Sequence, residues 1–268
     1  MNLNFHQTFK PEKKYITELL ILAKGKKELT KEEISLETGI PQGKSSGKVL
    51  PHLEYAKFMN LIDFNLNKKK YCLKLTELGE TIYEEDLLLS EYLTTLLLHC
   101  MMIRPKIGAD LWNFCFMKYP IKYGYNSKLN YLDKEINDYF HVKVNLGPLS
   151  CSYDTFFAEL NILKINRKED LFIVNNIGYD NQLEYLYGYV LYELWDIMYP
   201  SQDEITVGEF DKLKISNCFG WTSSQQYETI ERLSEKKLLR LNKQLMPYTI
   251  LRIASKQAIL NKLFADLF

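Results

Sequence analysis

The sequence predicts a mainly α protein with a winged helix-turn-helix at its N-terminus, a helical middle region and a second winged helix-like module at its C-terminus. Near the start, three helical patterns are followed by a short alternating hairpin, and a similar order returns near the end. Between them lies a stretch rich in aromatic residues. We therefore expect three parts, at residues 1–80, 81–200 and 201–268.

Composition places the chain among ordinary globular proteins. It has 268 residues, of which 46% are hydrophobic and 25% charged, and its 34 basic and 34 acidic residues cancel. Any nucleic-acid contact must therefore come from a local basic face. The longest apolar run, residues 87–103, contains Glu91 and His99 and suits a buried helix better than a membrane span. We expect a cytoplasmic protein that makes no membrane contact.

Sequence signals mark each element of the N-terminal part. Residues 11–24 have helical spacing, and Thr30 with Glu33 forms a T-x-x-E capping box that opens a second helix ending at Gly39. A third helix is expected over residues 44–61, with Pro51 bending it or delaying its start. Residues 63–76 then alternate as two strands, joined by a lysine-rich turn at 67–70.

The stretch GIPQGKSS, residues 39–46, resembles a phosphate-binding loop but lacks its context. Such a loop reads G-x-x-x-x-G-K-[ST], whereas three residues separate Gly39 from Gly43. A phosphate loop also follows a buried strand, and this stretch follows an amphipathic helix. The sequence therefore favours a turn before a recognition helix.

The remaining elements are predicted from the same kinds of signal. Helices are expected over 75–86, 87–103, 127–140 and 182–198, with short strands flanking a polar turn at 166–168. In the C-terminal part, a helix over 206–215 and a turn at 217–221 precede a second capping box, Thr222 to Gln225. That box opens a helix to about residue 237, followed by a hairpin with its turn at 242–244.

The first candidate DNA-binding face combines the start of the third helix with the lysine turn. In a winged helix-turn-helix, the recognition helix reaches base edges while the wing rests on phosphates. Residues 1–76 carry 14 lysines against 8 acidic residues. The alternative is a solvated lysine face used for protein contacts. The candidate residues are Gln42, Lys44, Ser45, Ser46, Lys48, Lys68, Lys69 and Lys70.

A second candidate face lies in the C-terminal module and is nearly neutral. Glu228, Glu231 and Glu235 follow on the same helix and would repel phosphates. A protein-contact or core role is therefore as well supported as DNA binding. The candidate residues are Ser223, Ser224, Gln226 and Lys243.

The sequence contains only weak catalytic and metal-binding patterns. Neither the acidic run Glu80, Glu84, Glu85 and Asp86 nor the set Asp154, Glu159, Lys164 and Glu169 contains the E-x-K pattern of nucleases. The histidines, at 6, 52, 99 and 141, form no metal-binding motif, and the five cysteines contain no C-x-x-C pair. The aromatic middle region could stack unpaired bases, although core packing is the simpler reading. We expect no catalytic residues, no metal and no cofactor.

Three segments, residues 39–62, 75–99 and 5–9, carry a resemblance to a bacterial family known as domain of unknown function 4007. Family members are often encoded beside sulfur-based DNA-modification or other anti-phage systems, so the resemblance implies a DNA-associated role in defence. The family often begins with a His-Glu-Thr-Phe-like stretch. Here Gln7 replaces the Glu, which removes an acidic group at that place. No catalytic motif is attached to the family.

The sequence thus predicts a non-catalytic DNA-binding accessory or recognition component of a bacterial DNA-modification or anti-phage system. Its expected partners are double-stranded DNA, other proteins of the same operon and, in a homodimer, a second copy of itself. The alternative is an adaptor whose winged helices dock a partner defence enzyme. A third hypothesis is that the protein is a nuclease that uses the acidic residues.

Overall fold

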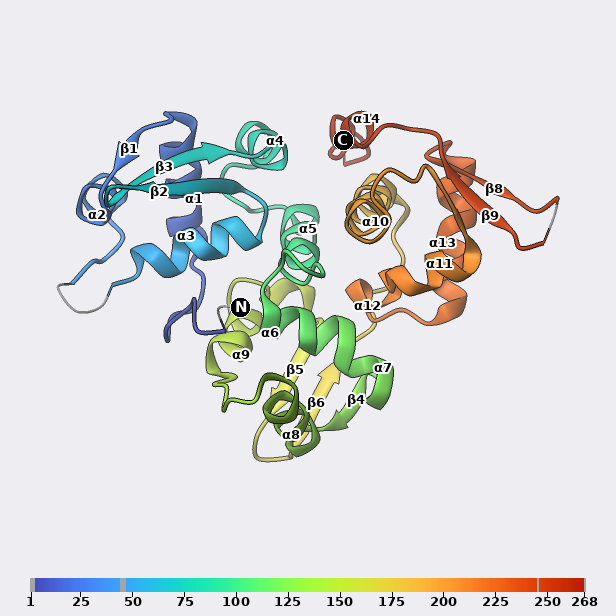
Figure 1. Ribbon diagram of the computed structural model, residues 1–268, viewed down its shortest axis with the longest axis horizontal. Coiled ribbons are helices and arrows are strands. Elements are labelled where there is room, and N and C mark those ends of the chain that lie inside the picture. Colours follow the sequence, from blue (N-terminus) through green and yellow to red (C-terminus); the bar gives the residue numbers. More distant parts are fainter. Residues whose placement is uncertain (1–2, 44–46, 245, 268) are drawn as a thin grey trace.

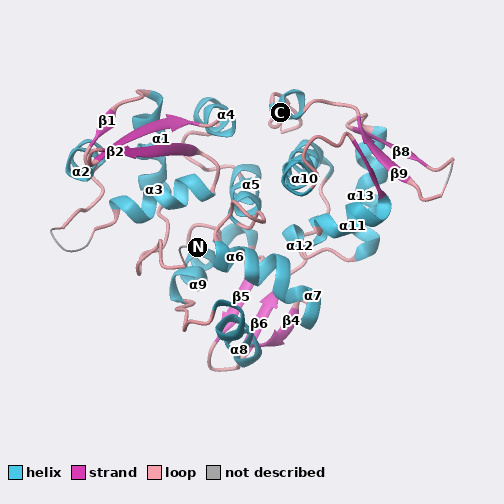
Figure 2. Cartoon of the chain, in the orientation of Figure 1, coloured by secondary structure: helices cyan, strands magenta, loops and turns pink. Residues whose placement is uncertain are grey.

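The protein is described by a computed structural model that covers residues 3–43, 47–244 and 246–267 (Figure 1). Within these ranges, the strands form three separate three-stranded antiparallel sheets, which Figure 2 shows as three groups of arrows. The chain is about 52% helical. The fold is therefore mixed α/β, and the finer expectation of a mainly α protein is not confirmed.

The N-terminal module contains the three predicted helices and the predicted hairpin, and also a short strand, Glu28–Leu29, that was not predicted. It contains α1 (Lys13–Lys24), β1 (Glu28–Leu29), α2 (Lys31–Thr38), α3 (Val49–Phe58), β2 (Ile62–Asn67) and β3 (Lys70–Leu75), with the sheet order β1-β3-β2. The Thr30–Glu33 capping box is present, and Gly39 ends α2 at a φ of 68°. This wing-like sheet is compatible with a winged helix. However, α3 begins at Val49 rather than residue 44, so Pro51 lies in its first turn.

Two helices connect this module to the rest of the chain. These are α4 (Glu77–Glu85) and α5 (Tyr92–Met102), and every residue of α5 from Leu93 onward is buried. Gly79 in α4 permits a close approach, because a Cβ there would lie 1.8 Å from the carbonyl oxygen of Leu61. The predicted 87–103 helix is thus confirmed as a core helix, with a later start.

The middle region contains a three-stranded sheet, of which the sequence predicted only the hairpin. Its elements are α6 (Asp110–Asn113), the π-helix Phe114–Lys118, α7 (Tyr119–Tyr123), β4 (Asn126–Lys128), α8 (Leu129–Phe140), α9 (Gly147–Asp154), the 3₁₀ turn Ala158–Leu160, β5 (Leu163–Asn166) and β6 (Leu171–Val174). The hairpin flanking residues 166–168 is confirmed. The third strand, β4, pairs with β6 and occupies the expected first turn of the 127–140 helix.

The C-terminal region begins with a 3₁₀ turn (Asn181–Leu183) and the long helix α10 (Glu184–Met198). It continues through β7 (Glu204–Thr206), α11 (Val207–Leu213), α12 (Ile215–Phe219), α13 (Ser223–Glu235), β8 (Leu239–Asn242), β9 (Thr249–Arg252) and α14 (Lys256–Leu260), with the sheet order β7-β9-β8. The Thr222–Gln225 capping box is confirmed at the start of α13.

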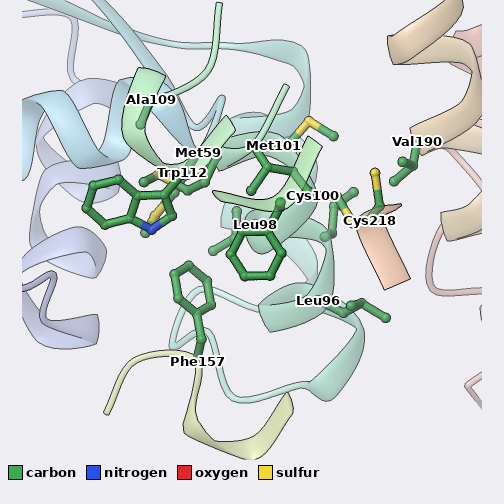
Figure 3. Packing of buried hydrophobic residues seen from close by; sticks show 14 of the residues in the cluster. Met59, Leu96, Leu98, Cys100, Met101, Ala109, Trp112, Phe157, Val190 and Cys218 are labelled. Carbon is green, nitrogen blue, oxygen red and sulfur yellow. The ribbon is translucent and has the colours of Figure 1, made fainter. Parts of the chain in front are cut away.

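One continuous buried cluster includes residues from all three predicted parts. In Figure 3, Leu98 and Met101 of α5 lie between Trp112 of α6 and Cys218 of α12. Figure 1 shows the N-terminal and C-terminal modules on either side of α5 and α10, with the middle region below them. Among the described residues, no helix has the length and apolar character needed to cross a membrane.

Candidate nucleic-acid interface

The lysine turn between β2 and β3 is a tight two-residue turn. Asn67 pairs with Lys70, and the two residues between them, Lys68 and Lys69, have φ values of 45° and 72°. Both central φ values are positive, as in the turns that match the twist of paired strands. Lys68, Lys69 and Lys70 are all exposed. Lysine is an unusual choice at positive φ, since such a backbone conformation costs about 1 kcal/mol or more per residue.

No carboxylate of the described residues pairs with these three lysines, whereas Lys74 on the same strand pairs with Asp63 at 3.4 Å. The turn lies against the start of α2 rather than against α3. A pocket of about 320 Å³ there is lined by Thr30, Lys31, Glu32, Leu66, Lys69 and Tyr71. Acidic groups of α2 therefore lie near the wing and offset part of its positive charge.

The pKa of Glu33 also indicates that α2 lies near the wing. The pKa of Glu33 is lowered, first by a hydrogen bond from the backbone N–H of Thr30 and, as a smaller cause, by the positive charge of Lys70. Lys31 lies beside the wing, because it follows β1 in the chain and β1 pairs with β3. Sequence reasoning missed Lys31, and recognising the two-residue strand β1 would have found it.

The expected start of the recognition helix is rearranged. Lys48 is the N-cap residue of α3, and its ammonium group lies 2.6 Å from a carboxylate oxygen of Glu12 and 5.6 Å from the ring centres of Phe9 and Tyr15. Gln42 donates to the carbonyl oxygen of Gly43 at 3.2 Å and so folds onto its own loop. Lys44, Ser45 and Ser46 lie outside the described residues.

Helix α3 is almost fully covered, which corrects the expectation of an exposed recognition helix. Lys57 is the one side chain of α3 that is exposed, and it pairs with Asp63 at 3.3 Å. Phe5 packs edge-on against Tyr55, at 4.9 Å between ring centres, and against Phe58 at 4.7 Å. Because the N-terminal segment and α6 cover this face, α3 cannot enter a major groove in this conformation.

The second candidate face is mostly engaged within the protein. Gln226 is buried and donates to Asp211 at 3.1 Å. Lys243 pairs with Glu231 at 2.9 Å. Ser223 and Ser224 are exposed in the first turn of α13. Gln226 therefore has the core role that the sequence left open beside DNA binding, and the charge of Lys243 is offset by Glu231.

Two of the candidate acidic residues and histidines, Asp86 and His99, have clear structural roles. Asp86 is buried and accepts hydrogen bonds from the backbone N–H groups of Ser90 and Glu91 at 2.9 and 3.0 Å, at the start of α5. His99 lies 2.7 Å from the hydroxyl of Tyr153, and burial lowers the pKa of its imidazole to about 3. Within the described ranges, no three His, Cys, Asp or Glu side chains gather as a metal site.

The aromatic residues of the middle region are largely core. Trp112, Phe116 and Tyr119 are buried, whereas Tyr131 and Tyr139 are 47% and 49% exposed. An ammonium group, that of Lys118, lies 4.4 Å from the ring centre of Tyr139. Most of these rings therefore pack in the core, which was the simpler interpretation of the sequence.

These features define a mixed α/β protein with three small sheets on a shared core and one lysine-tipped wing. Two crystal structures of SspB, one of them bound to a magnesium ion, have the same fold, with TM-scores of 0.74 and 0.72. Each is 13% identical to this chain, and the alignments cover 98% of it and 88% of the SspB chain. No family model and no curated protein matches the sequence. The likeness establishes the fold, and the resemblance to domain of unknown function 4007 stays an expectation.

Proposed function

We propose that this chain is a DNA-binding accessory or recognition component of a bacterial DNA-modification or anti-phage system. The observation that carries the proposal is the wing turn, where Lys68, Lys69 and Lys70 extend into solvent without a carboxylate partner among the described residues. The defence context is supported by the resemblance of residues 39–62, 75–99 and 5–9 to a family encoded beside such systems.

The geometry favours contact with the DNA backbone over base reading. A narrow hairpin tip carrying three ammonium groups can lie against phosphates, where each contact releases condensed counterions. Helix α3 is covered and exposes only Lys57, so it contributes no side chains that would distinguish bases. We therefore propose affinity that depends steeply on salt and weakly on DNA sequence.

The test is duplex binding measured by fluorescence anisotropy between 50 and 200 mM salt. Changing Lys68, Lys69 and Lys70 together to Gln should lower the slope of log K against log salt by about 2.7, since each phosphate contact contributes about 0.9. A matched control changes three exposed cations of the C-terminal module, Lys212, Lys237 and Arg240, to Gln. Wild-type protein without salt-dependent binding, or a wing variant that behaves like the control, would refute the proposal.

The adaptor remains the second candidate, because two large apolar side chains of the N-terminal module face solvent. Leu36 on α2 is 86% exposed, and Leu66 beside the wing is 62% exposed. If the adaptor reading holds, Leu36→Arg with Leu66→Arg should abolish binding to a purified protein of the same operon. Duplex binding would then be absent from the wild type.

We further propose that the chain does not itself cleave DNA. One SspB structure holds a magnesium ion, so cleavage is tested with Mg²⁺ present. Plasmid DNA incubated with wild-type protein and Mg²⁺ should stay intact. Cleavage that disappears in Glu169→Gln, a change at an exposed acidic residue of the β5–β6 turn, would establish the nuclease reading instead.

A further inference from the structure

Two adjoining depressions run between the middle region and the N-terminal segment. The first, of about 600 Å³, lies between α8, residues 143–145 and the β5–β6 turn. The second, of about 380 Å³, lies between residues 8–12, the N-cap of α3 and the start of α9. Asn145 lines both, so the two depressions adjoin at this residue, and we call them together the Asn145 trough. Figure 1 shows α9 between α3 and α8, the helices that the trough connects.

The trough has an excess of positive charge. Its cationic lining residues are Lys10, Lys48, Lys143 and Arg167, against two carboxylates, Glu12 and Asp133. The ammonium group of Lys48 is paired with Glu12. Lys10, Lys143 and Arg167 have no carboxylate partner in the part of the chain that the structure describes. Unneutralised cations at both ends of a groove suit an extended polyanion better than a small ion.

The floor of the trough combines apolar and amide groups. Ile136 and Val144 line the first depression, and Phe9 and Pro148 line the second. The side-chain oxygen of Asn145 accepts a hydrogen bond from the backbone N–H of Gly147 at 2.9 Å, and its amide N–H groups have no partner among the described residues. Apolar surface for base faces, amide groups for base edges and flanking cations for phosphates are what a single-stranded nucleic acid requires.

We propose that the Asn145 trough binds a single-stranded segment of DNA. The inference rests on the proposed function, because it takes DNA as the partner, and it extends the contact from the wing to the middle region.

The chain carries its own reporter for this site. Cys151 is exposed and lines the second depression. A fifteen-residue oligothymidylate should slow the alkylation of Cys151 by iodoacetamide at least threefold, as measured by mass spectrometry of the Cys151 peptide. Cys72 on β3, which is partly exposed and lies outside the trough, serves as the internal comparison.

A charge-neutralising variant tests the cations directly. Lys143→Gln with Arg167→Gln should restore the alkylation rate and lower the salt slope of oligothymidylate binding by about 1.4, since single strands lose about 0.7 per phosphate contact. The matched control is Lys134→Gln with Lys168→Gln, which changes exposed residues of α8 and of the β5–β6 turn that do not line the trough. The control should bind like the wild type.

The outcomes separate this inference from the wing proposal. Duplex binding that depends on Lys68, Lys69 and Lys70, together with no protection of Cys151 by saturating oligothymidylate, overturns the trough alone. Protection of Cys151 in a protein that binds no duplex supports the trough and refutes the wing. Equal protection by heparin would show a site for any polyanion and would overturn the assignment to a DNA strand.

Discussion

The buried carboxylate of Glu193 provides the sharpest test of how the modules are held together. It lies 2.7 Å from Arg104, which follows α5, and 2.9 Å from Lys256 at the start of α14. The side chains of Glu193 and Arg104 are 8% and 4% exposed. Burial alone would raise the pKa of Glu193, but attraction to Arg104 and Lys256 outweighs it and lowers the pKa. The carboxylate is therefore charged at neutral pH.

Changing Glu193 to Gln keeps the shape of the side chain and removes its charge. Arg104 would then be buried without a neutralising partner, which costs about 3–5 kcal/mol of folding free energy. The matched control is Glu84→Gln, because Glu84 pairs with Lys24 at 3.7 Å on the surface, with side chains 67% and 42% exposed. Exposed pairs of this kind contribute less than about 1 kcal/mol.

The assay is urea unfolding at pH 7, followed by far-ultraviolet circular dichroism, with wild type and both variants in parallel. A loss below about 1.5 kcal/mol in Glu193→Gln, or a loss equal to that of Glu84→Gln, would refute the reasoning. It would mean that Arg104 reaches water when its partner is neutral.

Two further predictions concern packing and pH. Gly79→Ala should destabilise by about 1–3 kcal/mol, because the added Cβ would meet the carbonyl oxygen of Leu61 at 1.8 Å. In Gly208→Ala of α11, the added Cβ would meet only the hydroxyl of Thr206, at 4.0 Å, so the change should be neutral or stabilising by up to about 1 kcal/mol. Equal unfolding midpoints for the two variants would contradict the packing. The pKa of His99 is about 3 when folded, against an ordinary 6.5, so below pH 6.5 the unfolded chain takes up a proton that the folded one does not. Stability should fall by up to about 1.4 kcal/mol per pH unit from pH 6.5 downward, and His99→Gln should flatten that slope in urea titrations at pH 6.5, 5.5 and 4.5.

Elements with a complete local signal were predicted well from the sequence. The capping boxes at Thr30 and Thr222 and the left-handed helix end at Gly39 all occur in the structure. Each depends on residues within four positions of one another, so local chemistry decides the backbone whatever packs around it. The wing turn was located for the same reason, since the alternation on either side fixes its register.

Elements that depend on distant partners were missed or misplaced. The three residues of β4 form a strand because β6, more than forty residues later, supplies hydrogen bonds. The residues Asn126–Lys128 alone do not predict a strand. Lys48 was expected to face DNA, yet Glu12 and two aromatic rings hold it toward the N-terminal segment. The side chain of Gln226 turns inward because Asp211 accepts its amide.

The same distinction between local signals and distant contacts applies to the candidate site. Composition and spacing alone determined that a lysine-tipped hairpin follows three helices, because charge and alternation are properties of neighbouring residues. Whether those lysines are free, whether α3 is exposed, and whether Lys10, Lys143 and Arg167 border one trough are questions of tertiary contact. Packing brings segments more than a hundred residues apart within a few ångströms of each other. The energy of those contacts depends on burial and mutual geometry, which the order of the residues does not specify.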